Sequence, residues 1–242
     1  MTGALNRSLR KQTGNSKAKL ELSHLSFPGL RMTRGWAPLF ALSIGVTSGF
    51  AAQAAPAADS SNRPVLILGD SLSAEYGLRR GTGWVALLSS RLQKQKRTIP
   101  VVNSSISGET TAGGRSRIDD LLKQYQPAWV VIELGGNDAL RGLDLAGTEA
   151  NLRYMVRASR AAKSRVLLVG MMVPPNYGKT YSQQFTGLFE KVARSEESAL
   201  VPFLLDGIGD RLDLFQADRI HPNEAAQSRM FENVWTVLQP LL

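Results

Sequence analysis

Between residue 65 and the C-terminus, short apolar runs alternate with longer amphipathic segments, and this alternation constrains the fold more than any other feature. Runs of consecutive aliphatic and β-branched residues are typical of strands buried on both faces of a parallel sheet. They predict five strands, at 65–68, 100–104, 129–134, 166–170 and 201–205. The intervening segments have the i, i+3, i+4, i+7 apolar spacing of helices, expected at 84–96, around 118–125, at 148–163, around 185–192 and at 223–238. We therefore predict one α/β domain over 63–242, with helices on both faces of a five-stranded parallel sheet.

The first apolar run ends in a turn that carries a serine. Gly69, Asp70 and Ser71 follow it directly, and Asp and Ser are both good N-caps, so we expect a helix to start behind this turn. Right-handed crossovers bring the carboxyl ends of parallel strands to one edge of the sheet, where ligands bind in open α/β folds. Taken alone, Ser71 has two interpretations, a helix cap or a reactive hydroxyl, and the cap is the commoner.

Further polar and glycine positions follow three other strands at the same edge. Gly108 lies in a glycine turn after the second strand, and Asn137 follows two glycines after the third. Asp218 and His221 lie beyond the fifth strand. Each residue has a plain structural interpretation of its own, as a turn, a helix cap, a loop cap or a surface histidine. Their convergence at one edge with Ser71 favours a functional interpretation.

Together these residues supply the groups of a serine hydrolase. Ser71 needs a base, and His221 is the only histidine beyond the N-terminal leader. Asp218, three residues earlier in the same loop, can hold the imidazole tautomer and stabilise the imidazolium. The N–H groups of Ser71 and Gly108 and the amide of Asn137 can serve as preorganised oxyanion donors. The mechanism requires no metal or organic cofactor, and a second histidine for a usual metal site is missing from this part of the chain.

Residues 1–54 predict a leader with an export signal. Arg31 and Arg34 precede an uncharged apolar run over 36–50, and Ala52-Gln53-Ala54 has the small-x-small pattern of a signal peptidase site. The run is short for a membrane span, which needs about 20 apolar residues. We therefore expect cleavage after Ala54, a flexible lead-in over 55–62, no stable membrane span after cleavage, and a periplasmic or secreted protein. Two alternatives stay open, namely translation from Met32 and an apolar run that remains as an uncleaved anchor.

The high net charge of the chain is concentrated in this leader. Of the formal net charge of +9, seven basic residues and one acidic residue before Ala55 contribute +6, which leaves +3 for the rest. No run in the rest mixes basic and aromatic residues as a nucleic-acid groove does, so we expect no nucleic-acid partner. Cysteine is absent, which excludes disulfides, a cysteine nucleophile and thiolate metal sites. Nothing in the pattern suggests an obligate assembly, and a monomer is expected.

The motifs at the strand ends resemble the four sequence blocks of the GDSL, or SGNH, hydrolase family. The blocks are Gly69-Asp70-Ser71-Leu72, the segment around Gly108, Gly135-Gly136-Asn137-Asp138 and Asp218-x-x-His221. The resemblance covers nearly all of 65–242. It is greatest to the periplasmic group of multifunctional acyl-CoA thioesterases, lysophospholipases and arylesterases, and the segment 174–178 adds to it.

The resemblance implies a three-layer α/β/α flavodoxin-like fold and a serine esterase that uses an acyl-enzyme on Ser71. It assigns His221 as general base, Asp218 as its orienter, and Ser71, Gly108 and Asn137 as the oxyanion hole. Carboxylic esters and thioesters of acyl substrates, lysophospholipids among them, are the implied substrates. Their acyl chain is expected in a groove beside the loop 139–144, with the loop 173–181 as a further wall.

Two residues depart from the family pattern and bear on the substrate range. Ala139 stands where relatives often have glycine, and Glu75 places a carboxylate near the nucleophile. A carbohydrate or small-molecule deacetylase shares the fold and triad and differs in groove shape, so it remains the alternative among enzymes. A non-catalytic lipid-binding protein would need a broken catalytic set, whereas every part is present here. Proteolysis is a third possibility, but amides are harder substrates, and at most activity on activated amino-acid esters is expected.

Overall fold

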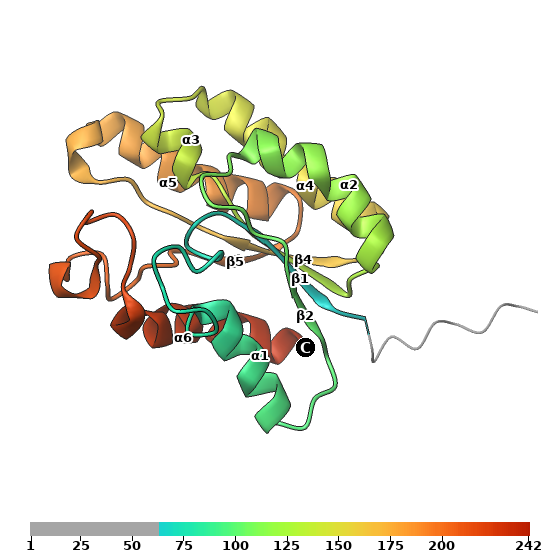
Figure 1. Ribbon diagram of the computed structural model, residues 1–242. Coiled ribbons are helices and arrows are strands. Elements are labelled where there is room, and N and C mark those ends of the chain that lie inside the picture. Colours follow the sequence, from blue (N-terminus) through green and yellow to red (C-terminus); the bar gives the residue numbers. More distant parts are fainter. Residues whose placement is uncertain (1–62) are drawn as a thin grey trace, which may run out of the picture. The chain divides into compact units, whose positions relative to one another are not determined.

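The computed structural model describes residues 63–242, which contain a five-stranded parallel sheet (Figure 1). The strands are β1 (Val65–Gly69), β2 (Val101–Asn103), β3 (Trp129–Glu133), β4 (Arg165–Val169) and β5 (Ala199–Val201). Their order in the sheet is β2-β1-β3-β4-β5, and every neighbouring pair is parallel. This is the flavodoxin-like strand order. The predicted α/β fold with five parallel strands is therefore confirmed.

Helices cover both faces of the sheet, which gives the three layers (Figure 1). One face carries α1 (Trp84–Lys94) and α6 (Gln227–Leu238), which pack against each other. The other face carries α2 (Thr111–Tyr125), the short α3 (Gly136–Leu140), α4 (Leu145–Ala161) and α5 (Lys179–Ser195), with α4 in contact with both α2 and α5. The described part of the chain also has the 3₁₀ turns η2 (Pro175–Tyr177), η3 (Leu212–Leu214), η4 (Glu224–Ala226) and η5 (Gln239–Leu241).

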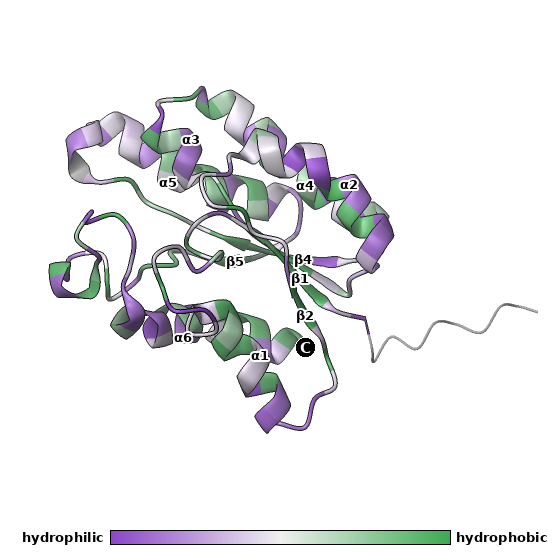
Figure 2. Cartoon of the chain, viewed as in Figure 1, coloured by the Kyte–Doolittle hydropathy of each residue, from purple (hydrophilic) through white to green (hydrophobic). Residues whose placement is uncertain are grey.

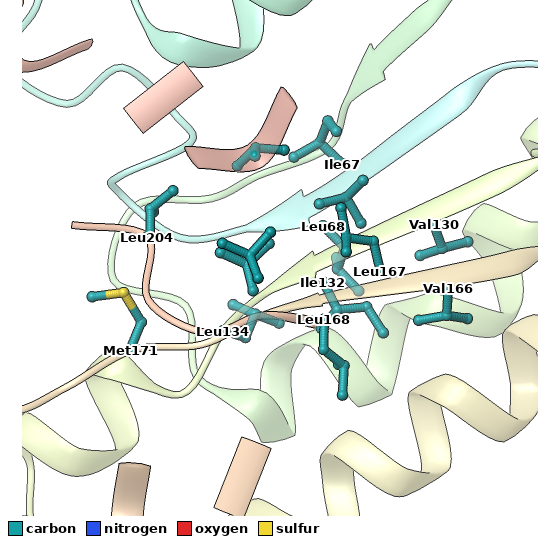
Figure 3. Close-up of a cluster of buried hydrophobic side chains, with 14 of the residues drawn as sticks. Ile67, Leu68, Val130, Ile132, Leu134, Val166, Leu167, Leu168, Met171 and Leu204 are labelled. Carbon is teal, nitrogen blue, oxygen red and sulfur yellow. The ribbon is translucent and has the colours of Figure 1, made fainter. Parts of the chain in front are cut away.

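The hydrophobic core lies between the sheet and the two helical layers. Ile67 and Leu68 of β1, Ile132 of β3 and Leu167 and Leu168 of β4 are all fully buried (Figure 3). Successive side chains of a strand point to opposite faces, so a continuous apolar run fills both layers at once. Burial of each such side chain contributes on the order of 1.5–3 kcal/mol. The sheet is thus a rigid support for the loops at its carboxyl edge.

Hydrophobic and hydrophilic residues alternate along the helices (Figure 2), and the buried residues of the longer helices recur at helical spacing. In α5, Phe185, Leu188, Phe189 and Val192 are buried at the predicted spacing. The rings of Phe185 and Phe189 meet edge to face, with centroids 5.3 Å apart. Most of the stability of such a helix comes from packing of this stripe on the sheet. The helical periodicity seen in the sequence therefore reports a real packing face.

The bounds predicted for the last strand, 201–205, are wrong. The strand β5 is Ala199–Val201, and its pairing with β4 ends before Pro202. Proline has no N–H to donate to a ladder, so it ends the strand. The chain then turns, and the N–H of Leu204 donates to the carbonyl of Gly170 at 3.0 Å. The predicted helix at 223–238 also starts later than expected, because its first residues form η4 and α6 begins at Gln227.

The predicted helix directly behind Ser71 is also wrong. The segment after it forms turns, and the first helix, α1, begins only at Trp84. The N–H of Ala74 donates to the carbonyl of Asp70 at 2.9 Å, which closes a single helix-like turn. Glu75 then has a φ of +60°, a left-handed conformation that a right-handed helix excludes. The nucleophile candidate therefore lies in a turn rather than at a helix terminus.

The predicted leader over 1–54 and the lead-in over 55–62 lie outside the described residues, as do the candidate start at Met32 and the cleavage after Ala54. Within 63–242, no helix is long and apolar enough to cross a membrane.

Candidate active site

The segments that carry the candidate site residues meet at the carboxyl edge of the sheet. Ser71 follows β1, Gly108 follows β2, and Asn137 lies in α3 directly after β3. His221 lies in the loop between β5 and α6. The strand order places β1 between β2 and β3, at the point where the crossovers change from one face of the sheet to the other. The fold thus brings together residues that are as many as 150 positions apart in the sequence.

Ser71, His221 and Asp218 form a hydrogen-bonded relay. The Nε2 atom of His221 lies 2.9 Å from Oγ of Ser71, and its Nδ1 lies 2.7 Å from Oδ2 of Asp218. A carboxylate only accepts, so Nδ1–H donates to Asp218 and Nε2 is left as an acceptor for the serine proton. The arrangement can therefore deprotonate Ser71 and later return the proton to a leaving group.

A tight turn fixes Asp218 beside His221. The N–H groups of Ile220 and His221 donate to Oδ1 of Asp218 at 2.9 and 3.0 Å, and Arg219 between them has a φ of +58°. These backbone donors, together with the His221 side chain, lower the pKa of Asp218 from 3.8 to about 2, because they stabilise its ionised form. The carboxylate stays charged at neutral pH and can hold the imidazole in one tautomer.

Further contacts fasten this loop to the turn that carries Ser71. The N–H of Gln216 donates to the carbonyl of His221 at 2.7 Å, and its side-chain amide donates to the carbonyl of Tyr76 at 2.9 Å. The ring of Tyr76 packs on the imidazole of His221, with centroids 4.5 Å apart. The sequence analysis missed Tyr76, because an aromatic residue five positions after a serine has no distinctive signal.

Two glycine turns shape the part of the edge where the oxyanion donors are expected. Gly108 has a φ of +78°, and the guanidinium of Arg141 donates to its carbonyl at 2.8 Å. Gly135 has a φ of +119° at the start of α3, where a Cβ would lie 3.2 Å from the ring of Phe189. Asn137 follows in the first turn of α3. A positive φ favours glycine at both positions, so the course of the backbone on either side of the expected donors depends on these two residues.

Asp138 ties these two segments together behind the edge. Its side chain is buried, and its Oδ2 accepts the N–H of Thr111 at 2.8 Å. The hydroxyl groups of Thr111 and Thr148 both donate to its Oδ1. Since Thr111 is the first residue of α2 and Asp138 lies in α3, this cluster fixes the Gly108 turn relative to Asn137.

Two buried carboxyl groups lie next to the nucleophile turn, and the sequence analysis missed their role. Asp70 is 3% exposed, and Glu133, the last residue of β3, is fully buried. Burial raises the pKa of Asp70 from 3.8 to about 6, although hydrogen bonds from Leu72 and Asn137 oppose the rise. Burial and then the charge of Asp70 raise the pKa of Glu133 well above its ordinary range. The sequence signal that could have pointed to Glu133 is its position within the apolar run 129–134.

The two departures from the family pattern have structural explanations. The carboxylate of Glu75 accepts the N–H groups of Gly81 at 2.9 Å and Gly83 at 2.8 Å, so it closes its own loop. Ala139 is fully buried in α3. Its carbonyl lies 3.4 Å from the hydroxyl of Tyr181.

A Ser-His-Asp relay at the carboxyl edge of a parallel sheet, with backbone turns beside the serine, defines the class of α/β serine hydrolases. The model of the GDSL-like Lipase/Acylhydrolase family matches residues 67–229. The chain belongs to this family, and the resemblance inferred from the four sequence blocks is confirmed. It is therefore an enzyme, a hydrolase of the GDSL type.

Similar proteins cover most of the described domain. Esterase TesA of Pseudomonas aeruginosa is 51% identical over 178 residues, which are 74% of this chain and 89% of that protein. The Escherichia coli (strain K12) protein named thioesterase 1/protease 1/lysophospholipase L1 is 41% identical over 178 residues, 74% of this chain and 84% of that protein. The crystal structure of psychrotrophic esterase EstA from Pseudoalteromonas sp., inhibited by monoethylphosphonate, has 39% identity and a TM-score of 0.71, and the match covers 74% of this chain and 98% of that one.

Proposed function

We propose that this protein hydrolyses carboxylic ester and thioester bonds of acyl substrates through an acyl-enzyme on Ser71. The observation that carries the proposal is the relay in which Ser71 Oγ lies 2.9 Å from His221 Nε2 and His221 Nδ1 lies 2.7 Å from Asp218 Oδ2. A serine hydroxyl is a weak nucleophile until a base within hydrogen-bond reach takes its proton. His221 is that base, and Asp218 orients it and stabilises its charged form.

The reaction proceeds by acyl transfer in two halves. Ser71 Oγ attacks the acyl carbonyl carbon while Nε2 of His221 takes its proton, and the negative charge moves to the carbonyl oxygen. The N–H groups of Ser71 and Gly108 and the amide of Asn137 stabilise that oxyanion, and one such donor accounts for about 10²–10³-fold in kcat. His221 then gives the proton to the leaving alcohol or thiol. Water repeats the sequence on the acyl-enzyme and releases the acid.

The surface beside the relay suits an acyl chain. The hydroxyl groups of Tyr177 and Tyr181 donate to the carbonyls of Leu140 and Ala139, at 3.4 Å each, so the two loops expected to wall the acyl groove are in contact. Leu140 and Leu143, both within the segment 139–144, expose large apolar side chains to solvent. Exposed apolar surface of this kind favours hydrocarbon ligands. The names esterase, thioesterase and lysophospholipase carried by the relatives support acyl esters and thioesters, lysophospholipids among them, as substrates.

The proposal extends to location and assembly. The leader over 1–54 directs export and is removed after Ala54, and the domain over 63–242 acts as a monomer in the periplasm or outside the cell. The basis for this part is the charge and hydropathy pattern of the leader. Sequencing of the N-terminus of the exported protein tests it, and a mature chain that begins at Ala55 is expected.

Hydrolysis of p-nitrophenyl esters, from acetate to palmitate, tests the nucleophile and the substrate class together. Ser71→Ala should lower kcat by at least about 10³-fold. Ser116→Ala is the matched control, because it removes an exposed serine hydroxyl from α2, and it should keep full activity.

The chain-length profile of the wild-type protein distinguishes the two enzyme candidates. A maximum at medium or long acyl chains supports the thioesterase and lysophospholipase proposal. A sharp maximum at acetate instead supports the deacetylase alternative. A folded protein that hydrolyses none of these esters contradicts the proposed function.

A further inference from the structure

Asp70 is held in the site through both of its carboxylate oxygens. Its Oδ1 accepts the N–H of Leu72 at 3.0 Å, and its Oδ2 accepts a side-chain N–H of Asn137 at 2.9 Å. The side chain is almost fully buried. Within the described part of the chain, the ionisable groups that act on it are Glu133 from β3 and His221 from the loop after β5. The residue before the nucleophile is thus bonded directly to a candidate oxyanion donor.

Glu133 lies beside Asp70 and has one oxygen without a donor. Its Oε2 accepts the hydroxyl of Ser73 at 2.7 Å and the N–H of Asp70 at 3.2 Å. Its Oε1 is buried and has no hydrogen-bond partner among the described residues. A bare carboxylate oxygen in such a place is costly, whereas a protonated carboxyl group is itself a donor. The negative charge of Asp70 beside it further disfavours an ionised Glu133. The proton belongs on Oε1 of Glu133, because each carboxylate oxygen of Asp70 already accepts an N–H, whereas Oε1 accepts none.

The charge of Asp70 decides which way the amide of Asn137 points. The two ends of an asparagine amide have nearly the same shape, so a neighbouring group must select between them. An ionised carboxylate only accepts, so it admits the NH₂ group of Asn137 and repels its carbonyl oxygen. One N–H of that NH₂ group bonds to Asp70, and the second N–H remains for a substrate oxygen.

We propose that Asp70 is a positioning residue for the oxyanion hole: its ionised carboxylate fixes the amide of Asn137 with one N–H directed at the reacting carbonyl. In this arrangement the protonated Glu133 keeps the buried acid pair at a single negative charge. The inference rests on the proposed function, since it takes Asn137 as an oxyanion donor. Asp70 itself touches no reacting atom.

A double-mutant cycle on kcat tests the proposal with the purified full-length protein and a p-nitrophenyl ester. In Asp70→Asn, the N–H of Leu72 retains the amide oxygen, so the new NH₂ group faces Asn137 and selects its flipped orientation. Asp70→Asn and Asn137→Ala should each lower kcat by about 10²–10³-fold with KM changed less than about threefold. The double variant should be no slower than Asn137→Ala. Multiplied losses in the double variant would overturn the proposal, because a merely structural role of Asp70 acts independently of Asn137.

Two isosteric acid-to-amide variants serve as comparisons. Glu133→Gln should lose no more than about tenfold in kcat, since the oxygen of a neutral amide can accept the hydroxyl of Ser73 and the N–H of Asp70 as the protonated acid does. If Glu133→Gln loses as much kcat as Asp70→Asn, the assignment of the negative charge to Asp70 and of the proton to Glu133 is overturned. Glu196→Gln removes a buried carboxylate that pairs with Arg153 and Arg157 on α4, away from the site, and should leave kcat unchanged. An equal loss in Glu196→Gln also overturns the proposal.

A second measurement decides the question if Asp70→Asn does not fold. The ratio of wild-type kcat to Asn137→Ala kcat cancels every effect of pH that the two proteins share. This ratio should fall as the pH drops below about 6, where Asp70 takes up a proton and no longer selects the amide orientation. A ratio that stays constant between about pH 5 and pH 8 overturns the proposal. Failure of the proposed function is distinct, because it appears as undiminished hydrolysis by Ser71→Ala.

Discussion

Replacement of Asp70 by asparagine should stabilise the folded protein at neutral pH although it slows catalysis. Burial raises the pKa of this carboxyl group from 3.8 in the unfolded chain to about 6 in the folded protein. The folded state therefore binds the proton more tightly, and stability is lost as the pH rises from about 4 to about 6. A difference of about two pKa units corresponds to about 3 kcal/mol, at 1.36 kcal/mol per unit. Asp70→Asn removes this pH-dependent loss.

Urea unfolding followed by circular dichroism at a series of pH values measures the effect. The quantity of interest is the unfolding free energy of Asp70→Asn minus that of the wild type, because carboxyl groups that titrate in both proteins cancel. This difference should move in favour of the variant by up to about 3 kcal/mol between about pH 4 and pH 7. Glu196→Gln provides the opposite case. Hydrogen bonds from Arg157 and Arg153 lower the pKa of Glu196. The unfolding free energy of Glu196→Gln should therefore fall relative to that of the wild type as the pH rises. A pH-independent difference for Asp70→Asn would refute the reasoning from burial.

Three further substitutions test other parts of the structure. Asp218→Asn should lower kcat by about 10⁴-fold in ester hydrolysis, because the amide NH₂ faces Nδ1 of His221 and favours the wrong tautomer; a loss under tenfold contradicts this. Gly135→Ala should lower the urea-unfolding free energy by at least about 1 kcal/mol, because φ is +119° and the added Cβ lies 3.2 Å from Phe189; an unchanged value argues against the turn. Phe189→Ala should lower the unfolding free energy by about 3–5 kcal/mol in the same assay, because the ring is buried in the core. A loss under about 1 kcal/mol would contradict that burial.

The sheet could be predicted from sequence because its central strands are buried on both faces. A continuous apolar run such as Val65 to Leu68 fits few environments other than a strand covered on both faces. The observed strand β1 is longer than this predicted run by one residue, Gly69. The last strand could not be placed in the same way. Its apolar run continues past Val201, but Pro202 cannot donate to the ladder, and the apolar residues beyond it pack from a turn. Hydropathy alone does not separate these two kinds of burial.

The candidate relay could be predicted because each of its residues occupies a strand end or the last loop. Parallel strands bring those positions to one edge, whatever the details of the loops. The supporting shell could not be predicted in the same way. Tyr76 reaches His221 only because its turn replaces the expected helix, and the hydrogen bond that Asn137 donates to Asp70 depends on a side-chain orientation that no spacing reveals.

Labelling with a fluorophosphonate tests most directly that Ser71 is the nucleophile. The reagent bonds covalently to an activated serine oxygen, and the adduct is located by mass spectrometry of proteolytic peptides. We predict one adduct on the wild-type protein, at Ser71, with loss of ester hydrolysis in proportion to labelling, and no adduct on Ser71→Ala. An active protein that is not labelled at Ser71, or that is inactivated by an adduct elsewhere, would contradict the mechanism.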